Sequence, residues 1–117
     1  MSTILICEDD PLLAADLAAR VEADGHRVLG PYCSARDALA NLPTPAPDVA
    51  IIDLSLADGQ TGSTIARALH SAGARVIIVS GYTNANADLW SIPHTYAAKP
   101  VSDELMHPLL NARACGC

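Results

Sequence analysis

The sequence has no phenylalanine, and aromatic residues make up only 3% of its 117 residues. Hydrophobic residues still account for 50% of the chain, so any core must be built mainly from aliphatic side chains. No apolar run approaches the roughly 20 residues that a membrane-spanning helix requires. No basic segment precedes the first apolar run, as it would in a signal peptide. We therefore expect a cytoplasmic protein without a membrane partner.

Basic residues are also scarce: Lys and Arg number seven against 13 Asp and Glu, which gives a formal net charge of −6. Because a nucleic-acid-binding domain needs positive charge to neutralise phosphates, this balance argues against nucleic acid as a partner. Lys99 is the only lysine in the chain. The length fits one domain, so we expect a single domain over residues 1–117 and no effector domain.

Cysteine and histidine show no spacing typical of a zinc site or a disulfide framework. Cys7 lies inside an apolar run, where a free cysteine acts as a small hydrophobic residue. Cys115 and Cys117 close the chain as Cys-Gly-Cys, which we interpret as a simple tail. The four histidines are scattered, so we interpret them as structural or surface residues.

Apolar runs alternate five times with segments of helical character. The expected strands cover about residues 3–7, 26–32, 48–53, 75–80 and 95–99. The expected helices follow them at about 10–25, 34–41, 63–73, 84–93 and 102–110. Short runs rich in Val and Ile that are followed by helices are typical of buried parallel strands. The sequence therefore predicts an α/β fold, with a doubly wound, five-stranded parallel sheet and right-handed crossovers.

The first helix has the clearest start signal, because Asp10 precedes Pro11 as an acidic N-cap precedes a proline in the first turn. After it, apolar residues recur at helical spacing at Leu12, Leu13, Leu17 and Val21. We therefore interpret Asp10 as a helix cap rather than as a ligand.

Carboxylates follow two of the apolar runs directly. Glu8 and Asp9 come after the first run, and Asp53 ends the third. In an open parallel sheet, the carboxyl ends of the strands border the crevice in which ligands bind. Like charges crowded there are unfavourable unless a cation joins them, and Mg²⁺ prefers oxygen ligands. The sequence therefore predicts a Mg²⁺ site at this edge of the sheet.

Four motifs, each at a strand end, carry a resemblance to a known family. They span Ile4–Pro11, Pro47–Leu54, Val76–Gly81 and Tyr96–Pro100. Together, in this order and spacing, they resemble the receiver domain of two-component response regulators over essentially the whole chain. The resemblance implies strand order 2-1-3-4-5, the flavodoxin-like order, with the first and third strands at the topological switch point.

The resemblance also implies a reaction. Asp53 would accept a phosphoryl group from a phosphohistidine on a sensor histidine kinase or a phosphotransfer protein. Asp9 and Asp53 would bind Mg²⁺ directly, Glu8 mostly through a bound water, and Ser55 through its backbone carbonyl. The chain would then be a phosphorylated regulator rather than an enzyme.

The remaining implied roles concern the switch. Lys99 and Ser80 would contact the phosphoryl oxygens, and Tyr96 would rotate as Ser80 moves. These movements would change the face formed by the fourth helix, the fifth strand and the fifth helix, to which a downstream protein would bind. We expect a stand-alone receiver with this output.

Other interpretations remain open. The chain could be a phosphate sink or relay intermediate, or a degenerate receiver that only docks partners. A metal-dependent nuclease or topoisomerase-type domain would need a second Asp in the segment Asp53–Ser55, which has none. A haloacid-type phosphatase would need an Asp-x-Asp motif on the first strand, and a flavodoxin-like flavin carrier would need a Ser/Thr/Gly-rich loop after it. The segment Glu8–Asp10 provides neither.

Overall fold

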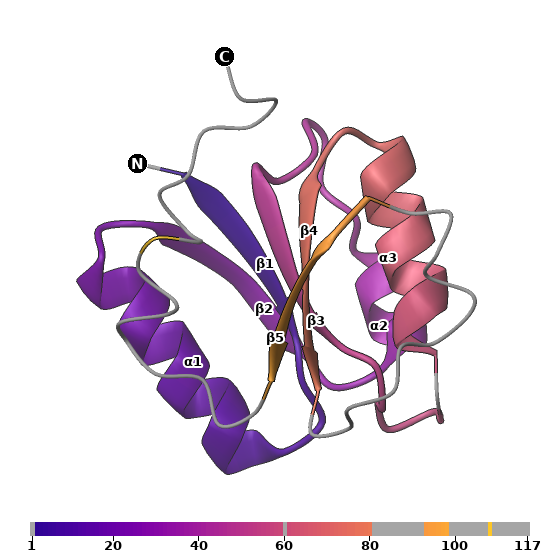
Figure 1. Ribbon diagram of the computed structural model, residues 1–117, viewed down its shortest axis with the longest axis horizontal. Helices are drawn as coiled ribbons and strands as arrows, with labels where there is room; N and C mark the ends of the chain where they lie inside the picture. The colour runs from indigo at the N-terminus through magenta and orange to yellow at the C-terminus, as the bar shows by residue number, and fades with distance from the viewer. Residues whose placement is uncertain (1, 60, 81–92, 99–107, 109–117) are drawn as a thin grey trace.

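Five parallel strands form the sheet, in the order β2-β1-β3-β4-β5. The computed structural model describes residues 2–59, 61–80, 93–98 and 108 (Figure 1). The strands are β1 (Thr3–Cys7), β2 (Arg27–Tyr32), β3 (Val49–Asp53), β4 (Arg75–Ser80) and β5 (Thr95–Ala98). The helices within the described ranges are α1 (Pro11–Ala23), α2 (Ala35–Ala40) and α3 (Gly62–Ser71). The predicted α/β fold, its parallel sheet and its strand order are confirmed.

The expected strand boundaries agree with the observed ones to within one residue. The helices expected near 84–93 and 102–110 lie outside the described residues, apart from Pro93 and Pro108. The same holds for Lys99, the last residue of the strand expected at 95–99.

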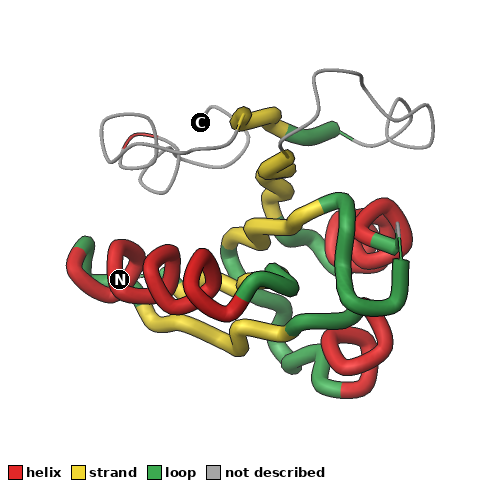
Figure 2. The backbone as a smooth tube through the Cα atoms, turned by 90° about the horizontal axis from the view of Figure 1, so that it is seen from below, coloured by secondary structure: helices red, strands yellow, loops and turns green. Residues whose placement is uncertain are grey.

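Helices cover both faces of the sheet: α1 lies on one face, and α2 and α3 lie on the other (Figure 1; seen from below in Figure 2). Because successive side chains of a strand point to opposite faces, each central strand contributes to two cores. Ile6 shares one core with Val21 of α1. Its neighbour Cys7 shares the other core with Ile65 of α3. The sheet is therefore held rigidly between two aliphatic layers.

Burial differs between the strands in the way that their order requires. All five residues of β3, at the centre of the sheet, are buried. The edge strand β2 has no buried residue. The strands that precede Glu8 and end in Asp53, β1 and β3, are thus both interior and buried strands.

The predicted cap of α1 is confirmed, because the Asp10 carboxylate accepts hydrogen bonds from the backbone N–H groups of Leu12 at 2.9 Å and Leu13 at 3.3 Å. The buried stripe of the helix is formed by Ala14 and Val21. Val21 and Leu17 of the predicted pattern pack against the core, but Leu12 is 83% exposed and Leu13 is 44% exposed, so the helical spacing identified this stripe only in part. At about 100° per residue, Leu12 lies on the side of the helix opposite Ala14 and Val21.

The structural interpretation of two polar residues is also confirmed. His26 is buried, and its Nδ1 accepts a hydrogen bond from the backbone N–H of Ser2 at 3.1 Å. Cys7 is a free, buried thiol, whereas Cys33 is free and exposed. None of the described helices is long and apolar enough to cross a bilayer.

Candidate functional site

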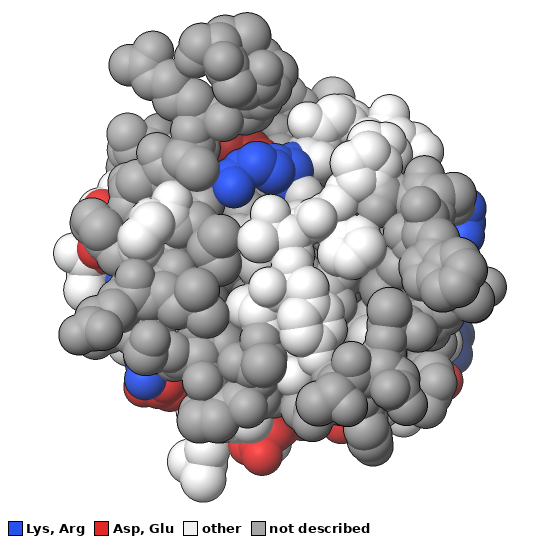
Figure 3. Space-filling model, in the orientation of Figure 1, with Lys and Arg blue, Asp and Glu red and all other residues white. Residues whose placement is uncertain are grey.

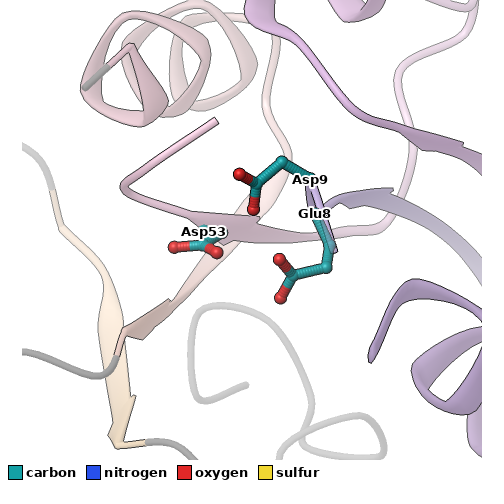
Figure 4. Close-up of side chains that lie close together, drawn as sticks. All are labelled: Glu8, Asp9 and Asp53. Carbon is teal, nitrogen blue, oxygen red and sulfur yellow. The ribbon is translucent and has the colours of Figure 1, made fainter. Parts of the chain in front are cut away.

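The acidic residues at the ends of β1 and β3 meet at one edge of the sheet. Cys7 pairs with Ile52 in the register of the two strands, so Glu8 stands beside Asp53 one residue further on. Oxygens from Glu8, Asp9 and Asp53 lie within 4.8 Å of one another. Figure 4 shows the three carboxyl groups around a common space. The acidic cluster predicted from the sequence is therefore present, and we call these three residues the acidic cluster.

The members of the acidic cluster differ in exposure. Glu8 and Asp53 are each only 5% exposed, whereas Asp9 is exposed. A Glu8 carboxylate oxygen accepts the backbone N–H of Asp10 at 3.2 Å, and the Glu8 N–H donates to the carbonyl oxygen of Tyr32 at 2.9 Å. An Asp53 carboxylate oxygen accepts the N–H of Ser55 at 3.1 Å. The two buried carboxylates, those of Glu8 and Asp53, are thus held by hydrogen bonds from backbone N–H groups, and Asp9 is exposed to solvent.

Three carboxylates this close repel one another when ionised. Two unit charges about 4 Å apart repel by about 4 kcal/mol at an effective dielectric constant of about 20. A divalent cation removes this repulsion, and an all-oxygen donor set with two nearly buried carboxylates fits a hard ion such as Mg²⁺. Acidic surface atoms also lie at the lower edge of the space-filling view (Figure 3), which is the edge toward which the strands point in Figure 1. The residues present therefore fit the predicted metal.

Asp10 does not belong to the acidic cluster among the described residues. Its side chain is engaged with the backbone of α1, where it accepts two N–H groups of the first turn. Asp9 and Asp10 have different roles because the chain turns from β1 toward α1 at these two residues.

The start of α3 packs against the backbone of Asp53 itself. A Cβ atom on Gly62 would overlap the carbonyl oxygen of Asp53 and the Cα atom of Leu54. The Gly62 N–H also donates to the carbonyl oxygen of Leu54 at 3.2 Å. Gly62 was not among the predicted site residues, although a glycine at the first position of a helix is a signal of close backbone approach. Because Gly62 has no side chain, the start of α3 can pack directly against the backbone of Asp53.

Ser80 and Tyr96 lie on the neighbouring strands. Val79 pairs with Asp53 in register, so Ser80 follows one residue beyond the end of β3. Ser80 is buried, and Tyr96 of β5 is 39% exposed. The Tyr96 hydroxyl donates to the backbone carbonyl oxygen of Ser80, with 3.5 Å between the two oxygens.

The structure places six of the seven predicted site residues. Ser55 follows Asp53 in the loop after β3 and is half-buried. The acidic cluster, Ser55 and Ser80 lie at or beside the carboxyl ends of β1, β3 and β4. Tyr96 lies within β5, where it pairs with Ile78 of β4. The seventh residue, Lys99, lies outside the described residues.

Comparison with known proteins gives a family match across most of the chain. The model of the response regulator receiver domain matches residues 4–109. A solved structure of a CheY-like receiver domain from Methylobacillus flagellatus is 25% identical, covers 94% of this chain and 96% of its own, and has a TM-score of 0.82. The family match covers all of the strands and helices described above except Thr3, the first residue of β1.

Two further relatives are a solved structure with a phosphorylated aspartic acid and a longer regulator that is matched over part of its length. A response regulator from Burkholderia pseudomallei, solved with a phosphorylated aspartic acid, calcium ion and citrate, is 21% identical, with a TM-score of 0.82. That match covers 96% of this chain and 68% of the other. The phyllosphere-induced regulator PhyR of Methylorubrum extorquens is 42% identical over 60 residues, which is 50% of this chain and 22% of PhyR. The matched region is thus a small part of that longer regulator.

Proposed function

Since the chain belongs to the response regulator receiver domain family, we propose that it is a phosphorylatable switch whose acceptor is Asp53. The observation that carries the proposal is the position of this carboxylate. Asp53 ends the central strand β3, within 4.8 Å of oxygens from Glu8 and Asp9. Aspartate carboxylates serve as phosphoryl acceptors in covalent chemistry, and this one is held by its bond from Ser55.

The proposed donor is a phosphohistidine on a sensor histidine kinase or a phosphotransfer protein. A carboxylate oxygen of Asp53 forms a bond to phosphorus while the bond from phosphorus to the histidine nitrogen breaks. The released imidazole nitrogen takes up a proton. In this proposal the chain is the recipient of the phosphoryl group and not an enzyme, and it works with its kinase in the cytoplasm.

We propose that Asp9 and Asp53 bind Mg²⁺ directly, that Glu8 acts through a bound water, and that Ser55 provides its backbone carbonyl. When bound, Mg²⁺ supplies positive charge that offsets the negative charge on the transferring phosphoryl oxygens. The phosphorylated aspartic acid and calcium ion in the Burkholderia pseudomallei structure support this kind of chemistry for the fold. The crowding of carboxylates in the acidic cluster supports it for this chain.

The proposed output is a change of surface that a downstream protein recognises. Ser80 and Lys99 contact the phosphoryl oxygens once Asp53 is modified. Tyr96, whose hydroxyl donates a hydrogen bond to the backbone carbonyl oxygen of Ser80, then responds to the movement of Ser80. In this proposal the surface that β5 forms with the helices expected near 84–93 and 102–110 carries the signal, without nucleic acid binding by this domain. The alternatives are a phosphate sink, a relay intermediate or a degenerate receiver that docks only.

The exposed start of α1 supports a protein donor. Leu12 is 83% exposed and Leu13 is 44% exposed, and both stand in the first turn of α1, two and three positions after Asp10. Large apolar side chains beside a reactive carboxylate favour contact with the apolar surface of another protein. We propose that the kinase or phosphotransfer protein contacts these two leucines as its phosphohistidine approaches Asp53.

The direct test is intact-mass measurement after treatment with a small phosphodonor such as acetyl phosphate. With Mg²⁺, the wild-type protein should gain one phosphoryl group, and it should gain much less with a chelator present. Asp53→Asn should gain none, and Asp10→Asn, the matched control, should label like the wild type. Unchanged labelling of Asp53→Asn would falsify the assignment of the acceptor.

A further inference from the structure

The loop that follows Asp53 is tied to the start of α2 by one side chain, that of Asp58. One carboxylate oxygen of Asp58 accepts the backbone N–H of Ala35 at 3.0 Å, and the other accepts the N–H of Arg36 at 3.1 Å. The hydroxyl of Thr61 donates to the first oxygen at 2.7 Å. All three contacts place a donor against the carboxylate, so the ionised form of Asp58 is the one that fits.

These bonds complete the cap of a short helix. The first backbone N–H groups of a helix have no partner within it. In α2, Asp58 accepts the first two, and Ser34 accepts the third, that of Asp37, at 3.1 Å. A helix of six residues has little stability of its own, so it depends on such caps and on packing. Asp58 and Ser34 therefore share one structural task in α2.

Of these two capping side chains, only that of Asp58 belongs to the loop after β3 and also holds this loop in place. Within that loop, Leu56 and Gly59 exchange backbone hydrogen bonds of 2.8 and 2.9 Å across a tight turn, in which Gly59 has a φ of 107°. The N–H of Ala57 donates to the carbonyl oxygen of Cys33 at 2.8 Å. The turn is thus closed on itself and attached to the segment before α2 by both its backbone and its Asp58 side chain.

Asp58 is also linked indirectly to the backbone of Asp53, through Thr61 and Gly62 at the other end of the loop. Thr61, which donates to Asp58, is the residue directly before α3. The next residue, Gly62, lies against the backbone of Asp53. The segment from Leu54 to Ser55 is therefore held between two anchored points, Asp53 on β3 and the turn that Asp58 attaches to α2.

We propose that Asp58 is a positioning residue for the metal site, acting by holding the loop on which Ser55 stands. This inference rests on the proposed function, in which the Ser55 carbonyl is a ligand of Mg²⁺. A loop already held in one conformation loses less freedom when a ligand binds, so it binds more tightly. Asp58 makes no contact with the acidic cluster among the described residues, and its effect passes through the loop.

The electrostatics of Asp58 agree with this role. The bond from Thr61 and the backbone bonds from Ala35 and Arg36 hold the pKa of Asp58 below its ordinary value. The carboxylate is therefore ionised at neutral pH and accepts all three bonds at once.

The test compares the Mg²⁺ affinity of four unphosphorylated proteins by calorimetric titration with Mg²⁺ alone: wild type, Asp58→Ala, Asp58→Asn and Ser34→Ala. Removing an outer contact of a metal site costs about tenfold or more in affinity, so Asp58→Ala should bind Mg²⁺ about tenfold more weakly. Asp58→Asn keeps one acceptor oxygen and should fall between Asp58→Ala and the wild type. Ser34→Ala removes a cap of the same helix without touching the loop, and it should stay within about twofold of the wild type.

A second readout follows the loop directly. Amide hydrogen exchange of Ser55 and Ala57 should be faster in Asp58→Ala than in the wild type, and unchanged in Ser34→Ala. Asp58→Ala with wild-type affinity, or Ser34→Ala with an equal loss, would overturn the positioning role and reduce Asp58 to a helix cap. The same result would leave the proposed function intact, because phosphorylation of Asp53 is measured separately by mass. Wild-type protein that binds no Mg²⁺ would overturn both the positioning role and the metal part of the proposed function.

Discussion

The hydroxyl of Tyr96 donates a hydrogen bond to the backbone carbonyl oxygen of Ser80, and the two oxygens are 3.5 Å apart. This bond is long, and bonds near this limit are weak and easily broken. It joins the buried end of β4 to the half-exposed ring on β5. A displacement of Ser80 toward a modified Asp53 would therefore break or redirect the bond and change the surroundings of the ring.

The first prediction concerns this connection. A beryllofluoride mimic of the phosphoryl group should shift the backbone amide signals of Ser80 and of Thr95–Ala98, in addition to those near the acidic cluster. A switch transmits a signal only if its two states bind a partner with different affinity, which requires such a change of surface. NMR spectra with and without the mimic measure it, and Tyr96→Phe should reduce the shifts on β5. If the shifts were confined to the loops after Glu8 and Asp53, the chain would be better described as a phosphate sink or relay.

A second prediction follows from the crowding of charge in the acidic cluster. In Mg²⁺-free buffer, Asp53→Asn should raise the free energy of unfolding by about 1–2 kcal/mol, because it removes one of three mutually repelling carboxylates. Urea denaturation measures this quantity. Asp10→Asn is the control: it removes a nearby charge, and asparagine is as good an N-cap as aspartate, so it should change stability little.

Addition of Mg²⁺ should reverse the order of stability of the wild type and Asp53→Asn. The wild type should gain stability in proportion to the logarithm of the Mg²⁺ concentration above its dissociation constant, and Asp53→Asn should gain much less. An Asp53→Asn variant that is destabilised in Mg²⁺-free buffer would contradict the account of repulsion.

The third prediction separates the two neighbouring acids after β1. Asp9 belongs to the acidic cluster, whereas the side chain of Asp10 is occupied by the first turn of α1. Asp9→Asn should weaken Mg²⁺ binding by about tenfold or more, which corresponds to about 1.4 kcal/mol. Asp10→Asn should change it only slightly, and equal losses in a Mg²⁺ titration would disprove this division of roles.

The acidic cluster could be predicted because its signal is local. Each carboxylate follows an apolar run without interruption, and parallel strands end at one edge of a sheet. The cap at Asp10 was predictable for the same reason, since the residues that it contacts are two and three positions away. Strand order came from the resemblance of whole motifs and not from the periodicity of any segment.

Other features depend on how distant segments meet. The contacts of Asp58 with Ala35 and Arg36 span 23 and 22 positions and form only after the loop has folded over α2. Helical spacing marked Leu12 as apolar, but which side of α1 faces the sheet depends on packing. That side includes Val21, which the pattern of large hydrophobic residues contains, and the small residue Ala14, which such a pattern cannot reveal.

The fourth prediction uses the contrast between two cysteines. Burial raises the pKa of the Cys7 thiol to about 12, from an ordinary value of 9.0. The folded protein therefore holds this proton more tightly than the unfolded chain, so the thiol's contribution to stability is complete below pH 9 and is lost between pH 9 and about 12. Cys7→Ala should remove this part of the pH dependence, which denaturation at several alkaline pH values measures.

Thiol labelling provides a second measurement of the same contrast. At pH 8, mass mapping should find Cys33 alkylated in the folded protein, because it is exposed, and Cys7 alkylated only after denaturation. Rapid labelling of Cys7 under native conditions would contradict its position in the core.

The fifth prediction concerns the protein donor. Leu12 is 83% exposed and stands three positions after Asp9 of the acidic cluster, whereas Leu39 in α2 is 40% exposed and belongs to a different helix. Leu12→Ala should slow phosphoryl transfer from a phosphorylated histidine kinase by about tenfold, since a well-placed apolar contact at an interface contributes about 1–2 kcal/mol. Leu39→Ala, the matched control, should have little effect on that rate. Labelling by acetyl phosphate should be the same in both variants, because a small donor does not reach either leucine. A loss of acetyl phosphate labelling in Leu12→Ala would mean that the leucine supports the site itself, and equal kinase rates in both variants would remove the start of α1 from the proposed contact surface.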